Sequence, residues 1–298
     1  MEKSLTPLAD LLPTIEKKMG AAGMDPQAIQ RELSFANQLI AGNDYLAGCS
    51  KQSLAAAVVN VANIGLTLNP AAKLAYLVPR KNKDKNITEA HLQPSYIGLC
   101  QLITQTGSVS NIIAQIVYEN DQFTLDLADN ERPVIHIPKL RTAERGRVVG
   151  AYALATLANG LKQPEWMDID ALYEIRERSE SWRSYKAGRI KSCTWQTDEG
   201  EMMRKTVVRR IYKYLPRGGN NAVADRAIEL DAQEYGATFQ QRMAIDDLLM
   251  GANISPERQN LIYQQNRDGQ MSYHEAAGII EELKANQAPA ADPKKQLS

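Results

Sequence analysis

The sequence predicts an α+β fold in which a largely antiparallel sheet packs against helices. Helical spacing of apolar residues dominates the N-terminal part, a run of alternating, strand-like segments follows, and helical spacing then returns. Strands and helices that come in separate runs are typical of α+β proteins. With 298 residues and 44% hydrophobic content, the chain can bury one sizeable core and a smaller second unit.

The N-terminal part is expected to hold two helices behind a tether. Residues 1–25 are punctuated by Pro and Gly, which favours a tether with one short helical piece. Apolar positions three and four residues apart predict a helix over residues 26–40, ended by Gly42. The same spacing predicts a second helix over residues 51–63, ended by Gly65.

The middle of the chain carries the strand signals. Alternating apolar residues bounded by turn residues predict strands over residues 74–78, 89–93, 109–118, 123–127, 134–137, 147–157 and 164–167. Residues 80–86 are expected to form a charged turn, and Asn159-Gly160 is typical of a two-residue hairpin turn. A helix is expected over residues 96–105, stopped by Gly107.

Helical spacing returns in the C-terminal part, over residues 169–178, 199–214, 222–236, 239–250, 256–264 and 272–283. The Gly- and Asn-rich residues 216–221 indicate a linker, and the composition of residues 285–298 indicates disorder. The expected organisation is therefore a tether (1–25), a core (26–217), a small helical region (218–284) and a disordered tail (285–298).

Charge is distributed unevenly although the net charge of the chain is zero. Residues 139–217 hold 17 basic and 10 acidic residues, whereas the parts before and after them are net negative by 2 and 5 charges. A neutral protein with a positive middle can bind a polyanion locally and stay in solution.

The cysteines and the apolar runs bear on the compartment. Cys49, Cys100 and Cys193 show no C-x-x-C spacing, and their odd number favours a reducing cytoplasm over a disulfide framework. No stretch approaches 18 uninterrupted apolar residues, so no membrane span is expected. The first residues show no apolar run of the kind found in secretory signals.

The most informative segment is residues 176–217. It holds 12 basic and 5 acidic residues, interleaved with Trp182, Tyr185, Trp195, Tyr212 and Tyr214. Phosphates require cations and unstacked bases require flat partners, so this mixture favours a groove for single-stranded nucleic acid. Its long loop, residues 179–194, is of a kind that is usually either functional or disordered.

The helix expected at the end of this segment has two distinct faces. One sector is apolar and contains Met203, Val207, Ile211, Tyr214 and Leu215. Another carries a row of cations at four-residue intervals, Lys205, Arg209 and Lys213, flanked by Arg210. Arg204 projects into the apolar sector and would need a buried acceptor. A basic helix face is more often simply solvated, and Trp182 and Trp195 taken alone are more often packing residues than stacking platforms.

The candidate contacts divide by chemistry. The expected phosphate ligands on the helix are Lys205, Arg209, Arg210, Lys213 and, with a buried phosphate as one of its alternatives, Arg204. The preceding loop would close the groove with Arg183, Lys186, Arg189 and Lys191. The turn between two strands offers Arg80, Lys81 and Lys83 to the second strand or to a neighbouring subunit. The candidates for base stacking are Tyr96, Trp182, Tyr185 and Trp195.

Four segments resemble the motifs of one family. Residues 195–216, WQTDEGEMMRKTVVRRIYKYLP, resemble the signature of the RecT family of phage and prophage recombinases. Upstream, residues 65–70 (GLTLNP), 75–79 (AYLVP) and 96–107 resemble further motifs of that family in the same order, and the strand after them closes in E-x-D-x-F. The resemblance covers about residues 30–217. Ile97 departs from the pattern, because many relatives have a basic residue there.

The resemblance implies a specific activity and fold. Such proteins pair complementary DNA strands without ATP and without breaking a covalent bond, so the chain is not expected to be an enzyme. They assemble on DNA as homo-oligomeric rings or helical filaments, and they act beside a partner exonuclease in a bacterial host cell. Their core is a bent antiparallel sheet against helices. No cofactor is expected, although a divalent cation such as Mg²⁺ would assist annealing by screening phosphates.

Two other functions compete with annealing. A metal-dependent nuclease would use the carboxylates Glu165, Asp168 and Asp170, but the two aspartates are more simply explained as caps of the following helix. A regulator that binds double-stranded DNA would insert the basic helix into a major groove, but no short Gly-containing turn precedes that helix. Preference for single strands separates annealing from regulation.

Further motifs are missing or scattered. The sequence contains no G-x-x-x-x-G-K-[ST], so nothing supports a P-loop ATPase. The three histidines, His91, His136 and His274, are far apart in the sequence and predict no zinc site. The acidic region after Gly218 is expected to bind the exonuclease or a host single-strand-binding protein, or else to stabilise an oligomer or remain a mobile tail.

Overall fold

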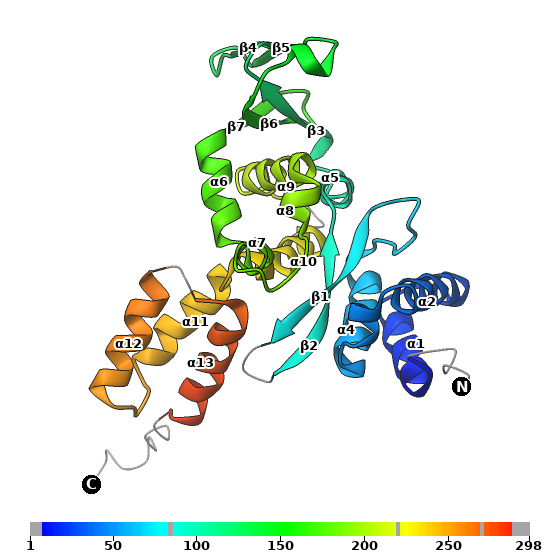
Figure 1. Ribbon diagram of the computed structural model, residues 1–298, viewed down its shortest axis with the longest axis vertical. Helices are drawn as coiled ribbons and strands as arrows, with labels where there is room; N and C mark the ends of the chain where they lie inside the picture. Colours follow the sequence, from blue (N-terminus) through cyan, green and yellow to red (C-terminus); the bar gives the residue numbers. More distant parts are fainter. Residues whose placement is uncertain (1–7, 83–85, 219–220, 269–270, 288–298) are drawn as a thin grey trace. The chain divides into compact units, whose positions relative to one another are not determined.

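The computed structural model describes residues 8–82, 86–218, 221–268 and 271–287 (Figure 1). The chain divides into two compact units, of which the first comprises Met1–Glu177 and Ser181–Asp231 and the second Arg178–Glu180 and Ala232–Ser298. The expected linker residues 219–220 and most of the expected disordered tail, residues 288–298, lie outside the described part.

The first unit begins with helices, which are α1 (Leu12–Ala21), α2 (Pro26–Ala41), α3 (Asp44–Ala47) and α4 (Lys51–Ile64), after a short turn η1 (Ala9–Leu11). Side chains of Asp25, Asn43 and Ser50 accept backbone N–H groups at the starts of α2, α3 and α4. Within the expected tether, Leu8 and the α1 residues Ile15 and Met19 are fully buried, and α1 packs on α4.

A buried carboxylate fixes the segment that follows α4. Gly65 ends the helix in the left-handed conformation, with φ of 64°. The Glu32 carboxylate on α2 accepts hydrogen bonds from the Leu68 amide at 2.8 Å and from the Thr67 hydroxyl at 2.5 Å. These contacts explain why the GLTLNP segment has a defined conformation between the helices and the first strand.

Among the residues that the structure describes, the strands of the first unit form three antiparallel sheets. The hairpin β1 (Ala75–Asn82) and β2 (Ile87–Pro94) stands alone, a second pair joins β4 (Gln122–Leu125) to β5 (Val134–Ile137), and the third sheet has the order β3-β6-β7. Its strands are β3 (Val109–Tyr118), β6 (Val148–Leu157) and β7 (Lys162–Asp168). The predicted α+β class with antiparallel strands is therefore confirmed, with the strands shared among several sheets.

Small residues on β6 allow two helices to approach the β3-β6-β7 sheet. Ala151, Ala153 and Ala155 are fully buried on one face of the strand, against which α9 (Glu199–Tyr212) packs, and α5 (Tyr96–Gln105) packs on α9 and β3 (Figure 1). On the alternate face, Tyr152 lies against Phe123, whose ring centroid is 5.5 Å away. The alternation of the strand therefore separates an aliphatic layer from an aromatic one.

The E-x-D-x-F motif forms the centre of the aromatic layer. Asp121 is buried and accepts hydrogen bonds from the Arg145 guanidinium, the His136 ring and the Tyr118 amide. Hydrogen bonds from Arg145 hold the pKa of the Asp121 carboxyl well below its ordinary value. Phe123 stacks on Trp166 with ring centroids 4.9 Å apart. The motif thus joins the β4-β5 pair to the larger sheet.

The segment between β7 and α9 is more helical than the sequence indicated. It contains α6 (Ile169–Arg178), α7 (Glu180–Lys186) and α8 (Thr194–Thr197). The expectation of one long loop over residues 179–194 was therefore wrong for its first half. Helix α7 carries Trp182, Tyr185 and Lys186, and local contacts among these side chains and α6 order the turn.

Helix α10 (Asn221–Ala232) follows the Pro- and Gly-rich segment and belongs to the first unit. The Tyr212 hydroxyl at the end of α9 donates a hydrogen bond to Asp225 at 2.7 Å, and Arg217 contacts the same carboxylate at 2.6 Å. The expected domain boundary at residue 218 thus lies before a helix that is anchored to the core.

The second unit is a small helical bundle with its own core. It contains η3 (Gln233–Tyr235), α11 (Phe239–Leu249), α12 (Pro256–Arg267) and α13 (Tyr273–Ala285). Capping boxes begin α11 at Thr238 and α13 at Ser272, and the Ser255 side chain caps the start of α12. The core is built on apolar side chains from all three helices, including Ile245, Ile262 and Leu283.

The cysteines are free thiols, and burial raises the pKa of Cys49 to about 11 and that of Cys100 to about 12. Cys193 is buried directly before α8. Within the described ranges, none of the helices has the length and apolar character that crossing a bilayer requires.

Candidate nucleic-acid interface

The residues expected to bind DNA lie in the first unit, on α9, on and after α7, at the start of α5 and on the β1-β2 hairpin. Their surroundings differ sharply. Some are buried and paired with a carboxylate in the core, some contact exposed carboxylates, and some are simply exposed. Lys83 lies outside the described residues.

The first group is a buried cluster around Asp231, the penultimate residue of α10. Lys205 on α9 is only 4% exposed, and its ammonium forms an ion pair with the fully buried Asp231 carboxylate. The Nε atom of Arg209 lies 3.2 Å from the same carboxylate. Gln93 on β2 donates to it at 3.4 Å, and the positive charge of Arg80 on β1 acts on it as well. The cluster therefore ties the hairpin and two helices together.

The charge state of Asp231 follows from these neighbours. Burial on its own would raise the pKa of this carboxyl, but the charges of Lys205 and Arg209 outweigh it and hold the pKa below its ordinary value. Asp231 is therefore an ionised carboxylate in the core. Breaking a buried pair of this kind by removing one partner typically costs about 3–5 kcal/mol of stability.

Lys205 was expected on a basic face of α9 open to a ligand. This expectation was wrong, because Asp231 on α10 covers the Lys205 side chain. Two side chains of the same region also differ from expectation. Tyr214 is 59% exposed rather than inward, since it lies beyond the end of the helix. Arg204 finds its acceptor near the surface, where its Nη1 atom lies 2.7 Å from Glu201. The DNA-binding role expected for Lys205 and Arg209 stays a prediction.

The second group lies at the corner between α6 and α7. The Arg176 guanidinium is held between two rings, 3.7 Å from the centroid of Tyr173 and 4.3 Å from that of Trp182. The Glu177 carboxylate accepts hydrogen bonds from the Trp182 indole at 2.9 Å and from Lys186 at 3.0 Å. These two hydrogen bonds lower the pKa of Glu177. Cation and ring are thus presented side by side.

The other aromatic candidates of this region separate by burial. The Tyr185 ring lies 5.7 Å from that of Trp182 and joins the corner. Trp195 on α8 is almost fully buried, which favours a packing role for it. A third patch brings Tyr96 on α5 close to Arg204, whose guanidinium carbon is 6.0 Å from the ring centroid.

Tyr76 joins the Tyr96 patch and was not identified from the sequence. It is 47% exposed on β1, and burial together with the nearby Glu201 raises the pKa of its hydroxyl. The same two causes raise the pKa of Tyr96. The signal for Tyr76 was the alternation of the AYLVP segment, in which Ala75 and Leu77 face inward and the tyrosine must face outward.

The remaining cations lie at the surface. Arg210 is half exposed and lies 2.6 Å from Glu165 on β7. The other exposed members of the expected set are Lys81, Arg183, Arg189, Lys191 and Lys213. Together with the two aromatic patches they are the side chains best suited to reach a polyanion.

The carboxylates of the nuclease alternative have structural partners. Glu165 pairs with Arg210, as described above. Asp168 accepts a hydrogen bond from the Ala171 amide at 2.8 Å and so caps the first turn of α6, which confirms the capping interpretation for this residue. The geometry of these two carboxylates is therefore explained by folding contacts alone.

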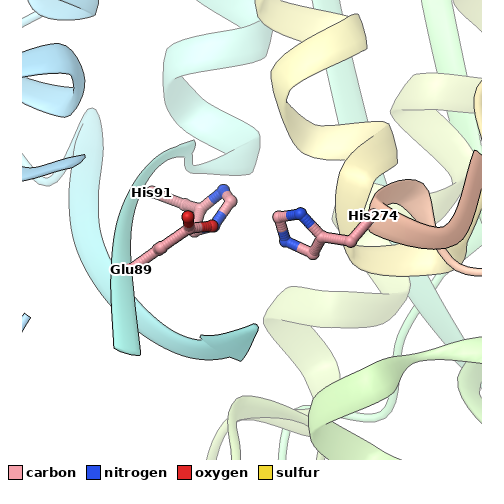
Figure 2. Close-up of side chains that lie close together, drawn as sticks. All are labelled: Glu89, His91 and His274. Atoms are coloured by element: carbon pink, nitrogen blue, oxygen red, sulfur yellow. The ribbon is translucent and has the colours of Figure 1, made fainter. Parts of the chain in front are cut away.

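The three histidines belong to different elements, His91 to β2, His136 to β5 and His274 to α13. His91 and Glu89 are neighbours on β2, with 3.9 Å between Nε2 and a carboxylate oxygen (Figure 2). His136 contacts Asp121 in the aromatic layer. His274, also drawn in Figure 2, belongs to the second unit, where its ring meets that of Tyr273 edge-on at 5.6 Å.

Comparison with known proteins agrees with the motifs. Residues 30–235 match the RecT family model. The protein is also similar to Protein RecT of Escherichia coli (strain K12), at 29% identity over 224 residues that cover 74% of this chain and 78% of that protein. The match extends beyond residue 217 and includes α10 and Asp231, in keeping with the place of this helix in the core.

An α+β unit with cations paired with partly exposed rings, together with these matches, defines a protein of the recombination and strand-annealing class. More narrowly, the family model covers over half of the chain, so the chain belongs to the RecT family.

Proposed function

We propose that this protein binds single-stranded DNA on the first unit and anneals it to a complementary strand in phage-type homologous recombination. The observation that carries the proposal is the pairing of cations with partly exposed rings, Arg176 and Lys186 beside Trp182 and Arg204 beside Tyr96. Cations follow the phosphate backbone, and rings accept unstacked bases of any sequence. Single strands offer both groups at once, whereas a duplex hides its base faces.

The cations of the site divide into two roles in this proposal. Exposed residues contact phosphates directly, and these are Lys81, Arg183, Lys186, Arg189, Lys191, Arg210 and Lys213, together with the partly exposed Arg204. The buried Lys205 and the partly buried Arg80 and Arg209 act through Asp231, which fixes the hairpin and α9 relative to one another. Each lost phosphate contact should flatten the salt dependence of single-strand binding by roughly 0.7.

Annealing then follows from alignment alone. Neutralising phosphate charge reduces the repulsion between two strands, and stacking on Tyr96, Trp182 or Tyr185 keeps bases extended. An extended strand loses less entropy when it finds the register of its complement. The reaction forms and breaks no covalent bond and uses no ATP. A divalent cation such as Mg²⁺ would assist it by screening phosphates.

Assembly and partners complete the proposal. A strand longer than one protein can cover favours a homo-oligomer, a ring or a helical filament, along the single strand and the annealed duplex. The second unit carries much of the negative charge of the C-terminal part, and its separate core suits a module that binds the partner exonuclease or a host single-strand-binding protein. The setting would be the cytoplasm of a bacterial host.

The test is an annealing assay with two complementary fluorescent oligonucleotides at low salt without ATP, read on a gel that also reveals cleavage. Faster pairing of intact strands is expected. Shortened strands would instead support the nuclease and make Glu165, Asp168 and Asp170 the residues to replace. Tight duplex binding without faster pairing would support the regulator.

A further inference from the structure

One carboxylate at the α6-α7 corner is surrounded by groups suited to bind a nucleotide. Glu177 accepts the Trp182 indole N–H on Oε1 and the Lys186 ammonium on Oε2. The Arg176 guanidinium lies 3.6 Å from the same Oε1 atom. Three donors from two helices therefore converge on a single side chain, which is 46% exposed.

This donor set matches what a nucleotide presents. Ammonium and guanidinium groups bind phosphate oxygens with strong charge-assisted hydrogen bonds, as they bind carboxylate oxygens. The partly exposed Trp182 ring lies beside them, and unstacked bases pack on aromatic rings of this kind. The Glu177 carboxylate contacts a Lys, an Arg and an indole N–H at once. It therefore occupies a position in which a backbone phosphate could contact the same three groups.

We propose that Glu177 occupies, in the DNA-free protein, the phosphate position of a nucleotide subsite formed by Arg176, Trp182 and Lys186, and that the DNA backbone displaces it. The inference rests on the proposed function and deepens it. Glu177 acts as an internal competitor, which keeps the subsite assembled without DNA and weakens binding to short or poorly placed strands.

The contacts around Arg176 explain how the subsite survives the exchange. Arg176 is mostly buried, and besides Glu177 it contacts the Tyr173 ring at 3.7 Å and the Glu199 carboxylate at 3.0 Å, two contacts that do not involve Glu177. Lys186 and Glu177, by contrast, are both about half exposed. Exposed ion pairs contribute little to stability, so a phosphate with more charge competes well against this one.

The experiment compares Glu177→Gln with Glu174→Gln in the full chain. Both variants remove one negative charge from α6, and Glu174 is exposed on the same helix. With a fluorescent oligothymidylate at low salt, Glu177→Gln is expected to bind about threefold or more tightly, because the DNA backbone no longer has to displace a carboxylate from Lys186. Glu174→Gln is expected to change the affinity by less than about twofold, as a general field effect.

A second variant identifies the group that Glu177 holds. The gain from Glu177→Gln should disappear in a Lys186→Ala background, because the freed ammonium is then missing. Tryptophan emission supplies a readout independent of affinity. DNA should change the emission of both the wild type and Glu177→Gln, because a base stacks on Trp182, and Trp182→Phe should abolish that change.

The outcomes separate the inference from the function on which it rests. Equal gains in Glu177→Gln and Glu174→Gln, or a gain that persists without Lys186, would overturn the displacement. Unchanged affinity in a Glu177→Gln variant that unfolds at the wild-type temperature would overturn it as well. Wild-type protein that fails to bind or anneal single strands would refute the proposed function itself.

Discussion

Asp231 and Glu177 both hold cations of the same basic segment, but in opposite surroundings. Asp231 is fully buried and receives Lys205 and Arg209 in the core, whereas Glu177 is half exposed and receives Lys186 at the surface. A buried ion pair is lost only at high cost, and an exposed pair exchanges its partner readily. The burial of the carboxylate that pairs with a cation therefore indicates whether the cation stabilises the fold or can exchange its partner for a phosphate.

The largest effect is expected from Asp231→Asn. The substitution keeps the shape of the side chain but leaves Lys205 and Arg209 without a buried countercharge, so the free energy of unfolding should fall by about 3–5 kcal/mol. Urea unfolding followed by far-ultraviolet circular dichroism measures it. Glu177→Gln serves as the control and should cost less than about 1 kcal/mol. Equal losses of unfolding free energy in the two variants would contradict the difference drawn between Asp231 and Glu177.

The pH dependence of the unfolding free energy should also show the contribution of the ionised Asp231 carboxylate. Because the pKa of Asp231 is lower in the folded protein than its ordinary value of 3.8, its ion pairs stabilise the fold fully above that value. This stabilisation is lost as the pH falls from there through the lower, folded pKa. The difference in unfolding free energy between wild type and Asp231→Asn should thus be constant near neutral pH and shrink in acid. A difference that grows in acid would contradict the assignment.

An intermediate effect is expected from the partly exposed Trp182 ring. Trp182→Ala should weaken single-strand binding by about 1–3 kcal/mol, the usual contribution of one stacked base. Trp195→Phe, in the core, should reduce thermal stability and leave the affinity of the folded protein unchanged. Fluorescence anisotropy with a labelled oligonucleotide measures both. Wild-type affinity in Trp182→Ala would remove the corner from the binding surface.

The smallest effect is expected at Glu201, which holds Arg204 beside Tyr96. This ion pair joins residues three apart on one helix and is easily replaced, so Glu201→Gln should raise single-strand affinity by about twofold and leave stability unchanged. Weaker binding in this variant would show that Glu201 positions Arg204 rather than competing for it.

Much of the fold could be predicted from local pattern. The strand over residues 109–118 and the helices over residues 96–105 and 169–178 match β3, α5 and α6, because alternation and helical spacing are local properties. The helices expected over residues 256–264 and 272–283 likewise correspond to α12 and α13, apart from their ends. The family resemblance was confirmed, since the family model matches the same region.

The interior of the candidate site could not be predicted in this way. Helical spacing placed Lys205 on a polar face, and only the return of α10 across a Gly-rich segment shows that Asp231 covers it. The linker signal at residues 216–221 indicated a domain boundary, although Tyr212 and Asp225 hold the two sides together. Long-range pairing of charges leaves no periodic trace in the sequence, so burial of a basic residue is visible only in three dimensions.

The most direct test of the account is the salt dependence of single-strand binding in Lys186→Ala and Lys205→Met. Lys186→Ala is expected to flatten the slope of log affinity against log salt by roughly 0.7, because an exposed cation that contacts a phosphate is lost. Lys205→Met should destabilise the fold but leave the slope of the folded protein unchanged. A flattened slope in Lys205→Met with an unchanged slope in Lys186→Ala would contradict the division between buried and exposed cations.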